Sequence, residues 1–455
     1  MGKCDLVVLG GKIVGLDGMV SGNLYVNDGK VIGVGKPDIV GRQRVDAGGL
    51  LVLPGMIDAH VHFMDPGDTS REDFPTGSAA AAVAGVTTVI EHSHSSPVRS
   101  AAELRKKVNH LKNRSVVDFG LGAHFPVGGV ELIPDLVKEG AALIKVFTCT
   151  THGIKAVDTG NLYTAMSRFA KLDVPFLVHA EDESLTLLAE TELKGAGRED
   201  GMVIPEWRNP LAEQVAASAV GHLALASGAK TVLAHCSHPQ IVDTVAVFRS
   251  RGARIYAEAC PQYFFLKEDE VKGMGGFRKF TPPARAKTKG DLDQMWERLR
   301  NRSFSYFASD HAPSNFDQKK KGSIWDVPFG LPGIDTTLPI MLDSAARGRL
   351  SYPLLVELYA RTPALIYGLY PKKGALRPGS DADFVLVDPK TQYRMEDRAI
   401  ISKAGWTPFA GRDLKGKVIA TFVRGRKVAE DRRCVEGAGW GAFLRPDSVF
   451  RRSGL

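Results

Sequence analysis

The chain has 455 residues, and its 59 basic residues outnumber its 51 acidic ones, giving a net charge of +8. Hydrophobic residues make up 44% and charged residues 24%, values that are typical of a globular protein and exclude a disordered one. No apolar run approaches the roughly 18 residues of a membrane-spanning helix, and the basic residues are scattered. We therefore expect no membrane partner and no nucleic-acid partner.

Five cysteines are spread through the chain without a CxxC pair, at Cys4, Cys149, Cys236, Cys260 and Cys434. Their odd number and wide spacing do not match a disulfide framework. The first residues also lack the apolar run of a signal peptide. These features predict a protein of the reducing cytoplasm.

The first fifty residues have the pattern of short strands joined by tight turns. Turns are predicted at Gly10-Gly11 and at Asn27-Asp28-Gly29, since Asp-Gly between short apolar runs is a strong hairpin signal. The flanking strands are predicted at residues 5–9, 12–14, 23–26 and 30–34.

The C-terminal part of the chain has the same pattern. Residues 382–387 form a candidate strand, and residues 418–423 and 426–428 form a candidate hairpin around Arg424-Gly425. Because both ends have β character, we expect them to pair into one small β-sandwich.

Between these ends, short β-branched runs alternate with alanine-rich helical stretches. Eight strands are predicted at residues 57–62, 86–91, 117–123, 142–147, 175–179, 231–235, 254–258 and 305–309. Helices are predicted between them at residues 78–84, 101–111, 161–172, 211–226, 240–249 and 291–299. This alternation favours an α/β fold with a (β/α)8 TIM barrel, and a doubly wound open sheet is the alternative. The expected domains are a barrel of residues 55–370 and a sandwich of residues 1–54 and 371–455.

Ionisable side chains stand where the predicted barrel strands end, and active sites of TIM barrels lie at these ends. His60 and His62 end the first strand, and side chains two apart on a strand point to the same face. Later strands end with His179, His235 and Asp310. We therefore expect these side chains to meet at one end of the barrel.

Lys145 lies inside an apolar strand, where a charged amine is costly unless it is paired or neutral. A buried ion pair is the structural explanation. The functional one is an amine that has lost its proton and adds carbon dioxide, forming a carbamate that could bridge two cations. The other positions have ordinary explanations too, since lone histidines pack in cores, Asp310 suits a helix N-cap, and a second His-x-His occurs at His92-Ser93-His94. Their joint occurrence at successive strand ends is much harder to explain by chance.

Motifs spread over most of the chain carry a resemblance to one enzyme superfamily. They are LPGMIDAHVH at residues 53–62, DPG at 65–67, SREDF at 70–74, AEACPQY at 257–263, PPAR at 282–285, SDHAP at 309–313 and GSDAD at 379–383. On these motifs the chain resembles the amidohydrolase superfamily, in the cyclic-amidase branch that includes allantoinase, dihydropyrimidinase or hydantoinase, and dihydroorotase. The SREDF motif is most similar to that of the allantoinases.

The resemblance implies a centre of two divalent ions, usually zinc, a metal that suits imidazole and oxygen ligands. The implied ligands are His60, His62 and Asp310 for one ion, His179 and His235 for the other, and Lys145, carboxylated by CO2, between them. The ions would share a hydroxide that attacks an amide carbonyl, while Asp310 would pass a proton to the leaving ring nitrogen. The implied function is therefore a hydrolase that opens the C–N bond of a cyclic amide.

Four residues are candidate substrate contacts, namely Met64, His94, Thr150 and Thr281. Dihydroorotases carry an arginine at the position of Met64 and an asparagine at that of His94, so a substrate carboxylate would lack its charge-assisted partners here. Hydantoinases place a tyrosine that stabilises the oxyanion where this chain has Thr150. Thr281 matches a position that contacts the substrate in hydantoinases.

Allantoinase is the nearest named activity, and dihydropyrimidinase, hydantoinase or another cyclic-imide hydrolase is the alternative. Dihydroorotase is less favoured, as is a non-catalytic scaffold homologue, because all six implied metal ligands are present. By resemblance we also expect a homo-oligomer, a dimer or tetramer, that binds a small cyclic amide.

Overall fold

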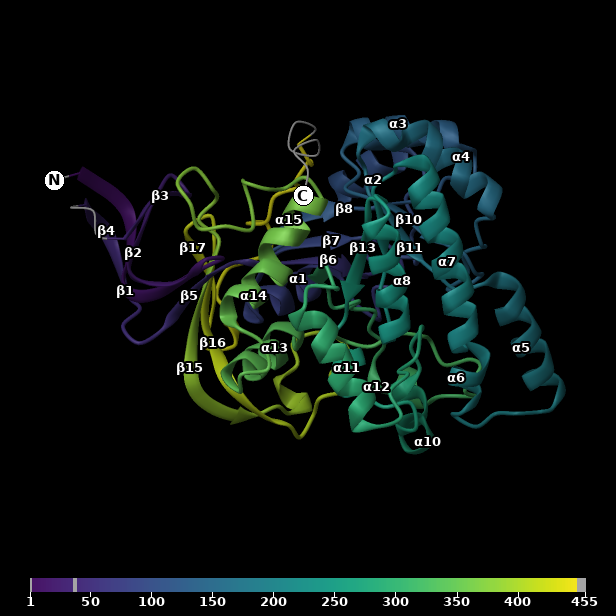
Figure 1. Ribbon diagram of the computed structural model, residues 1–455. Helices are drawn as coiled ribbons and strands as arrows, with labels where there is room; N and C mark the ends of the chain where they lie inside the picture. The colour runs from purple at the N-terminus through teal and green to yellow at the C-terminus, as the bar shows by residue number, and fades with distance from the viewer. Residues whose placement is uncertain (1, 36–38, 448–455) are drawn as a thin grey trace.

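Parallel strands of the central segment form a closed barrel, shown in Figure 1. The structure is a computed structural model that describes residues 2–35 and 39–447. The barrel strands are β6 (Met56–Val61), β7 (Val86–Glu91), β8 (Asp118–Leu121), β9 (Ala123–His124), β10 (Ile144–Phe147), β11 (Phe176–His179), β12 (Thr231–Leu233), β13 (Ile255–Ala259) and β14 (Tyr306–Phe307).

Hydrogen bonds between neighbouring strands close the ring. β9 to β14 pair in order in one sheet, and β6 to β8 pair in another. β8 and β9 are two halves of one barrel strand interrupted at Gly122, whose N–H donates to the Glu91 carbonyl at 2.8 Å. Beyond β14, the His311 carbonyl accepts from the His62 N–H at 2.8 Å. The predicted eight-stranded TIM barrel is thereby confirmed.

Helices connect the strands and cover the outside of the barrel (Figure 1). They are α1 (Phe74–Val83), α2 (Ala101–Leu111), α3 (Ile133–Glu139), α4 (Thr159–Phe169), α5 (Glu183–Gly195), α6 (Val203–Trp207), α7 (Pro210–Ser227), α8 (Pro239–Ser250), α9 (Gln262–Phe265), α10 (Glu270–Met274), α11 (Lys289–Arg300), α12 (Phe316–Lys320), α13 (Thr337–Ala346), α14 (Tyr352–Val356) and α15 (Thr362–Ile366). All six predicted helices are present. α1 begins four residues before the predicted start, because the Asp73 carboxylate caps it by accepting from the Thr76 N–H at 2.9 Å.

Strands from both termini form a second, nine-stranded sheet. They are β1 (Gly2–Gly15), β2 (Gly18–Asn27), β3 (Lys30–Gly35), β4 (Ile39–Asp46), β5 (Leu51–Pro54), β15 (Phe384–Arg394), β16 (Asp413–Val423), β17 (Arg426–Glu430) and β18 (Arg433–Cys434). Antiparallel pairing of β5 with β15 joins the two ends of the chain. The Phe384 and Phe422 rings stack in its core with centroids 4.2 Å apart. The predicted sandwich of both termini is confirmed.

The predicted turn at Gly10-Gly11 is instead a bulge within the single long strand β1. Before the bulge β1 pairs with β4, and after it β1 pairs with β5. A Cβ on Gly11 would stand 2.5 Å from Cγ2 of Val52, so glycine permits the close approach of β5. The other two predicted turns are present, with the left-handed residues Asp28 (φ 49°) and Arg424 (φ 48°) in them.

We propose a barrel domain of residues 55–370 and a sandwich domain of residues 1–54 and 371–455. β5 ends at Pro54 and β6 begins at Met56, which suits the first boundary. Residues 1, 36–38 and 448–455 of the proposed sandwich lie outside the described part of the chain.

The last described segment runs along barrel strand β8. The Phe119 N–H donates to the Ala442 carbonyl at 3.0 Å, and the Leu444 N–H donates to the Phe119 carbonyl at 2.7 Å. The Ala442 N–H also donates to Oδ1 of Asp118 at 2.8 Å. The C-terminal segment thus forms hydrogen bonds with β8, although the two segments are more than 300 residues apart in the sequence.

A buried ionic cluster joins the barrel to the sandwich. Lys373 Nζ lies 2.5 Å from Asp118 Oδ2 of β8, 2.6 Å from Asp383 Oδ2 and 2.9 Å from Asp381 Oδ2. Arg424 pairs with Asp118 as well. Burial alone would lower the pKa of Lys373, but the three carboxylates raise it above its usual value. The amine therefore stays charged and balances the acidic groups.

Lys373→Met is expected to lower the free energy of unfolding by about 3–5 kcal/mol, because it leaves buried carboxylates without their shared cation. Urea unfolding followed by circular dichroism measures this change. The matched control is Lys372→Met, which removes a neighbouring exposed lysine and should change stability by less than about 0.5 kcal/mol. Equal losses of unfolding free energy in the two variants would contradict the role of Lys373 as the shared cation of the buried cluster.

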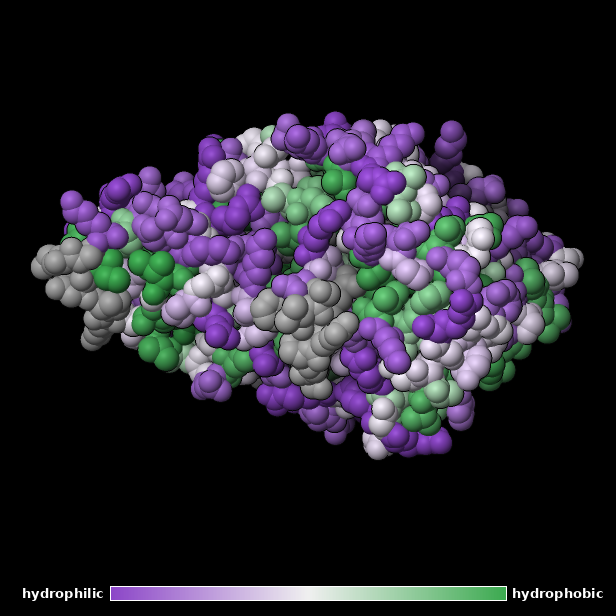
Figure 2. All heavy atoms as spheres, turned by 90° about the horizontal axis from the view of Figure 1, so that it is seen from above, coloured by the Kyte–Doolittle hydropathy of each residue, from purple (hydrophilic) through white to green (hydrophobic). Residues whose placement is uncertain are grey.

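Apolar side chains gather at the end of the molecule that the terminal sheet forms, on the left of Figure 2. Exposed hydrophobic residues of β1 to β3 and their connections are Leu16, Met19, Val20, Ile32 and Val34.

Among the described residues, no helix is long and apolar enough to cross a bilayer. The expected homo-oligomer stays a prediction.

Candidate active site

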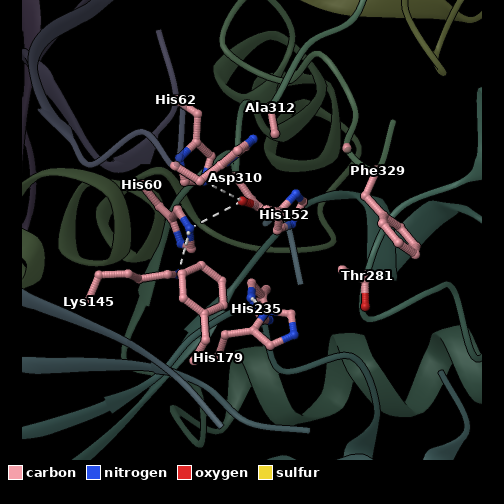
Figure 3. A pocket seen from close by; sticks show the side chains of 13 residues that line it. His60, His62, Lys145, His152, His179, His235, Thr281, Asp310, Ala312 and Phe329 are labelled. Carbon is pink, nitrogen blue, oxygen red and sulfur yellow. Dashed lines mark hydrogen bonds and ion pairs between the residues drawn. The ribbon is translucent and has the colours of Figure 1, made fainter. Parts of the chain in front are cut away.

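Residues at the carboxyl ends of the barrel strands line one pocket, shown in Figure 3. The lining consists of His60, His62, His94, Lys145, Phe147, His152, His179, His235, Thr281, Asp310, Ala312, Phe329 and Gly330. It includes all six residues that the sequence analysis assigns to metal binding. Parallel strands that end at the same rim bring them together from positions up to 250 residues apart.

His60, His62, Lys145 and Asp310 form one cluster in the pocket (Figure 3). His60 Nε2 lies 3.2 Å from Lys145 Nζ and 3.2 Å from Asp310 Oδ1. His62 Nε2 lies 3.5 Å from the same carboxylate oxygen. Two imidazole nitrogens, an amine and a carboxylate oxygen therefore face one another.

His179 and His235 form a second cluster beside the first. His179 Nδ1 lies 2.9 Å from His235 Nε2, and the His235 and His60 ring centroids are 5.7 Å apart. His235 and Asp310 both have left-handed backbones, with φ of 38° and 50°. Such conformations are costly for residues other than glycine and are concentrated at functional sites.

A buried carboxylate, Glu258 of β13, holds both clusters. Its Oε1 accepts from His60 Nδ1 at 2.8 Å and from the His235 backbone N–H at 2.8 Å. Its Oε2 accepts from the Tyr306 hydroxyl at 2.6 Å. Glu258 therefore sets both the ring plane of His60 and the path of the chain at His235.

Glu181 has the same role for His179. Its Oε2 accepts from His179 Nε2 at 2.6 Å and from the Thr281 hydroxyl at 2.7 Å, and Arg208 Nη1 lies 3.5 Å away. Burial alone would raise the pKa of Glu181, but the Arg208 charge and the hydrogen bonds lower it to about 2. The carboxylate is therefore ionised in the folded protein near neutral pH.

These partners determine which nitrogen of each ring is free. His60 Nδ1 and His179 Nε2 face carboxylates, and His62 Nδ1 faces the His92 carbonyl at 3.2 Å. Assigning the ring protons to these nitrogens leaves a lone pair on the opposite nitrogen of each ring. Burial lowers the pKa of His60 and His62 well below the usual range, so the rings are neutral.

Burial also changes the acid–base properties of Lys145 and Asp310. It lowers the pKa of Lys145 to about 8 and raises that of Asp310 to about 7. Lys145 is 2% exposed, whereas the Asp310 side chain is 13% exposed and faces the pocket. A neutral amine at Lys145 is therefore accessible near neutral pH, as carbamate formation requires.

The four predicted substrate contacts divide into two pairs. His94 and Thr281 line the pocket. Met64 does not, because its left-handed backbone (φ 55°) turns the side chain into the core, where its sulfur accepts from the Ser93 hydroxyl at 3.0 Å. Thr150 is exposed, and its hydroxyl donates to Glu183 at 2.5 Å. The structure thus places Met64 and Thr150 away from the pocket.

His152 occupies the pocket in place of Thr150. Its ring stacks on His94 with centroids 4.3 Å apart and planes inclined by 28°, and it lies beside Asp310 in Figure 3. The sequence analysis missed His152 because a left-handed turn (φ 52°), invisible in the strand pattern, directs it inward. It also missed Glu181, two residues after the end of β11, and Glu258, although a carboxylate inside the mostly apolar strand β13 was an available signal.

Comparison with known proteins identifies the family. Residues 51–428 match the Amidohydrolase family. The chain belongs to this family. It shares 34% identity over 418 residues with a dihydroorotase from Methanothermobacter thermautotrophicus, an alignment that covers 92% of this chain and 93% of the relative. It shares 33% identity with an allantoinase from Rubrobacter xylanophilus over 98% of both chains.

Solved structures of similar fold agree with the assignment of this chain to the amidohydrolase family. An L-hydantoinase (dihydropyrimidinase) from Arthrobacter aurescens superposes with a TM-score of 0.93 at 29% identity, covering 97% of this chain and 100% of the other. A D-hydantoinase superposes with a TM-score of 0.91 at 28% identity, covering 97% of this chain and 99% of the other. The protein is therefore a hydrolase that acts on cyclic amides.

The amidohydrolase family is metal-dependent, and the described side chains suit cations. His60, His62 and His92 lie within metal-binding distance of one another, and both ring nitrogens of His92 lack a partner among the described residues. Metal-binding histidines usually have one ring nitrogen bound to a carboxylate or carbonyl, and His60, His62 and His179 meet this condition. The donor set therefore fits divalent ions.

Glu258→Gln is expected to weaken metal binding about 10- to 100-fold, because the amide orients the His60 ring less strongly than the carboxylate. Metal retention against a graded series of chelator concentrations measures the change. The control is Glu213→Gln, which alters a buried carboxylate bonded to Ser237 instead of to an imidazole. Unchanged retention in Glu258→Gln would show that His60 needs no such partner.

Proposed function

We propose that this amidohydrolase opens the ring of a ureide, hydantoin or imide by adding water across its C–N bond. The convergence of His60, His62, Lys145, His179, His235 and Asp310 in one pocket carries the proposal. In this proposal His60, His62 and Asp310 hold one divalent ion, and His179 and His235 hold the other. Lys145, carboxylated by CO2, would supply oxygen ligands to both. Zinc is the proposed metal, since it suits this donor set.

The chemistry that two bound divalent ions would supply is a lowered pKa of a bound water and polarisation of the amide carbonyl. Asp310 is the acid–base residue of the proposal, because its carboxylate faces the pocket. It takes the proton of the attacking water and delivers it to the leaving ring nitrogen. Without that proton the nitrogen would leave as an amide anion, which is a poor leaving group.

His152 is the proposed donor to the carbonyl oxygen of the substrate. It lines the pocket, where its ring lies against the rings of His94, Phe147 and Phe329. Burial lowers its pKa well below the usual range, so the ring is neutral and carries one N–H. Stacking on His94 fixes the plane of that ring. A preorganised N–H of this kind stabilises the negative charge that develops on the oxygen.

An allantoinase-like activity is the first candidate, supported by the SREDF motif and the relative of that name. Dihydropyrimidinase or hydantoinase activity is the alternative, supported by the structural neighbours. Dihydroorotase activity is less favoured because Met64 and His94 offer no cation to a carboxylate beside the HxH motif, although a relative carries that name.

Zinc-loaded enzyme is expected to hydrolyse at least one of allantoin, 5-substituted hydantoins, dihydrouracil and succinimide, and to hydrolyse dihydroorotate poorly. Formation of the ring-opened product from each compound is followed by liquid chromatography. Turnover of none of the ring compounds would refute the proposal. Efficient turnover of dihydroorotate would refute the argument that Met64 and His94 disfavour a substrate carboxylate.

Two variants connect that activity to the proposed centre. Lys145→Ala should lose both metal and turnover, and a short-chain carboxylic acid that imitates the carbamate should restore part of each. Asp310→Asn should keep most of the metal and lose turnover by roughly 10²-fold or more, since it removes proton transfer. Metal analysis beside the assay separates the two effects. Full metal content in Lys145→Ala would end its bridging role.

His152→Phe is expected to lower kcat by about 10²-fold, the usual cost of losing one oxyanion donor, with little change in KM or metal content. Thr150→Val is the matched control, since it removes the hydroxyl that points away from the pocket, and its kcat should change by less than about 3-fold. The reverse pattern would assign the oxyanion to Thr150.

A further inference from the structure

A second cavity lies beside the active-site pocket and shares two of its walls. Its volume is about 320 Å³, and it lies between the loop after β9 and the loop after β10. Lys145 and Phe147 line both this cavity and the pocket. We call it the side cavity, and its further walls include Arg99, His124, Val130, Ile154, Lys155 and Val157.

The sheet register places the side cavity on the inner face of the barrel rim. Lys145 and Phe147 are two apart on β10, so they point to the same face. Lys145 is the direct cross-strand partner of His124 on β9, and partners in a sheet share a face. The side cavity therefore opens on the same side of β10 as the proposed metal ligand.

Cationic and polar groups of the side cavity have no partners of their own. Among the described residues, no acidic group pairs with Arg99 or Lys155, and Arg99 Nε is buried without a hydrogen-bond partner. His124 is 2% exposed, and both of its ring nitrogens lack partners. The one acid of the lining, Asp158, already accepts from the Asn161 N–H at 2.9 Å and from Asn161 Nδ2 at 2.5 Å.

Buried polar atoms in folded proteins are nearly always hydrogen-bonded, so unpartnered ones that line a cavity are available to a group that enters it. Apart from Lys145, which the proposed function assigns to the metal centre, the lining carries two cations, Arg99 and Lys155, against one acid, Asp158. This balance favours an anion, and a carboxylate accepts from guanidinium and imidazole groups together. Val130, Ile154 and Val157 leave an apolar path for the methylenes that carry it.

We propose that the side cavity binds an anionic arm of the substrate, a carboxylate on a short aliphatic chain attached to the ring that the proposed function opens. The inference rests on that function and narrows it to cyclic amides with acidic substituents. Arg99 is the specificity-determining residue, because its guanidinium has a buried Nε without a partner, whereas Lys155, the other cation of these loops, is exposed. A ring over Lys145 extends its substituent past Phe147 into the side cavity.

The test compares two substrates of nearly equal shape, racemic hydantoin-5-propionate and hydantoin-5-propionamide, with zinc-loaded enzyme. Wild-type enzyme is expected to show a kcat/KM about 10- to 100-fold higher for the acid, as one charge-assisted pair supplies. Arg99→Gln should lower kcat/KM for the acid by about 10-fold or more and change that for the amide by less than about 2-fold. Arg99→Lys, which keeps the charge, should restore part of the preference.

The control is Arg300→Gln, which removes the same charge from an exposed position at the end of α11 and should leave the acid-to-amide ratio unchanged. Hydrolysis of both compounds without a preference for the acid overturns the inference and leaves the proposed function standing. An equal loss on both substrates in Arg99→Gln also overturns it. Hydrolysis of neither compound by an enzyme that opens allantoin, dihydrouracil or succinimide overturns the inference alone. Turnover of none of these ring compounds refutes the proposed function, and the inference fails with it.

Discussion

The active site depends on one constraint: each imidazole must keep a particular ring nitrogen free. Glu258 and Glu181 satisfy it for His60 and His179 by accepting from the opposite nitrogens. A carboxylate is a better partner than water here, because it is buried, ionic and fixed in position. Arg208 in turn keeps Glu181 ionised. The rim of the barrel therefore carries two concentric sets of side chains, of which only the inner one faces the substrate.

Sequence patterns predicted the parts of this design that depend on local periodicity. The strands β6, β7 and β10 to β13 lie within two residues of their predicted bounds, because parallel strands buried on both faces consist of short, nearly continuous apolar runs rich in β-branched residues. The same argument placed His60, His62 and Lys145 near one another, since parallel strands of a barrel end at one rim.

Features that depend on long-range packing could not be predicted in the same way. Thr150 and His152 are two residues apart in one loop, and only the left-handed turn at His152 decides which of them enters the pocket. Glycine pairs occur in both turns and bulges, so the sequence alone does not show that Gly10-Gly11 forms a bulge and not a turn. The close approach of Val52 to Gly11 decides between the two. The roles of Glu181 and Glu258 needed the distances to their histidines.

The hydrogen bonds between Phe119 and the segment at Ala442 have a consequence for biosynthesis. During translation, β8 emerges from the ribosome more than 300 residues before the strand-like segment that covers it. The β8 edge of the incomplete barrel stays exposed throughout that interval, and exposed strand edges attract other chains. Protection of this edge by chaperones until the segment at Ala442 has been synthesised would therefore favour a good yield of folded enzyme.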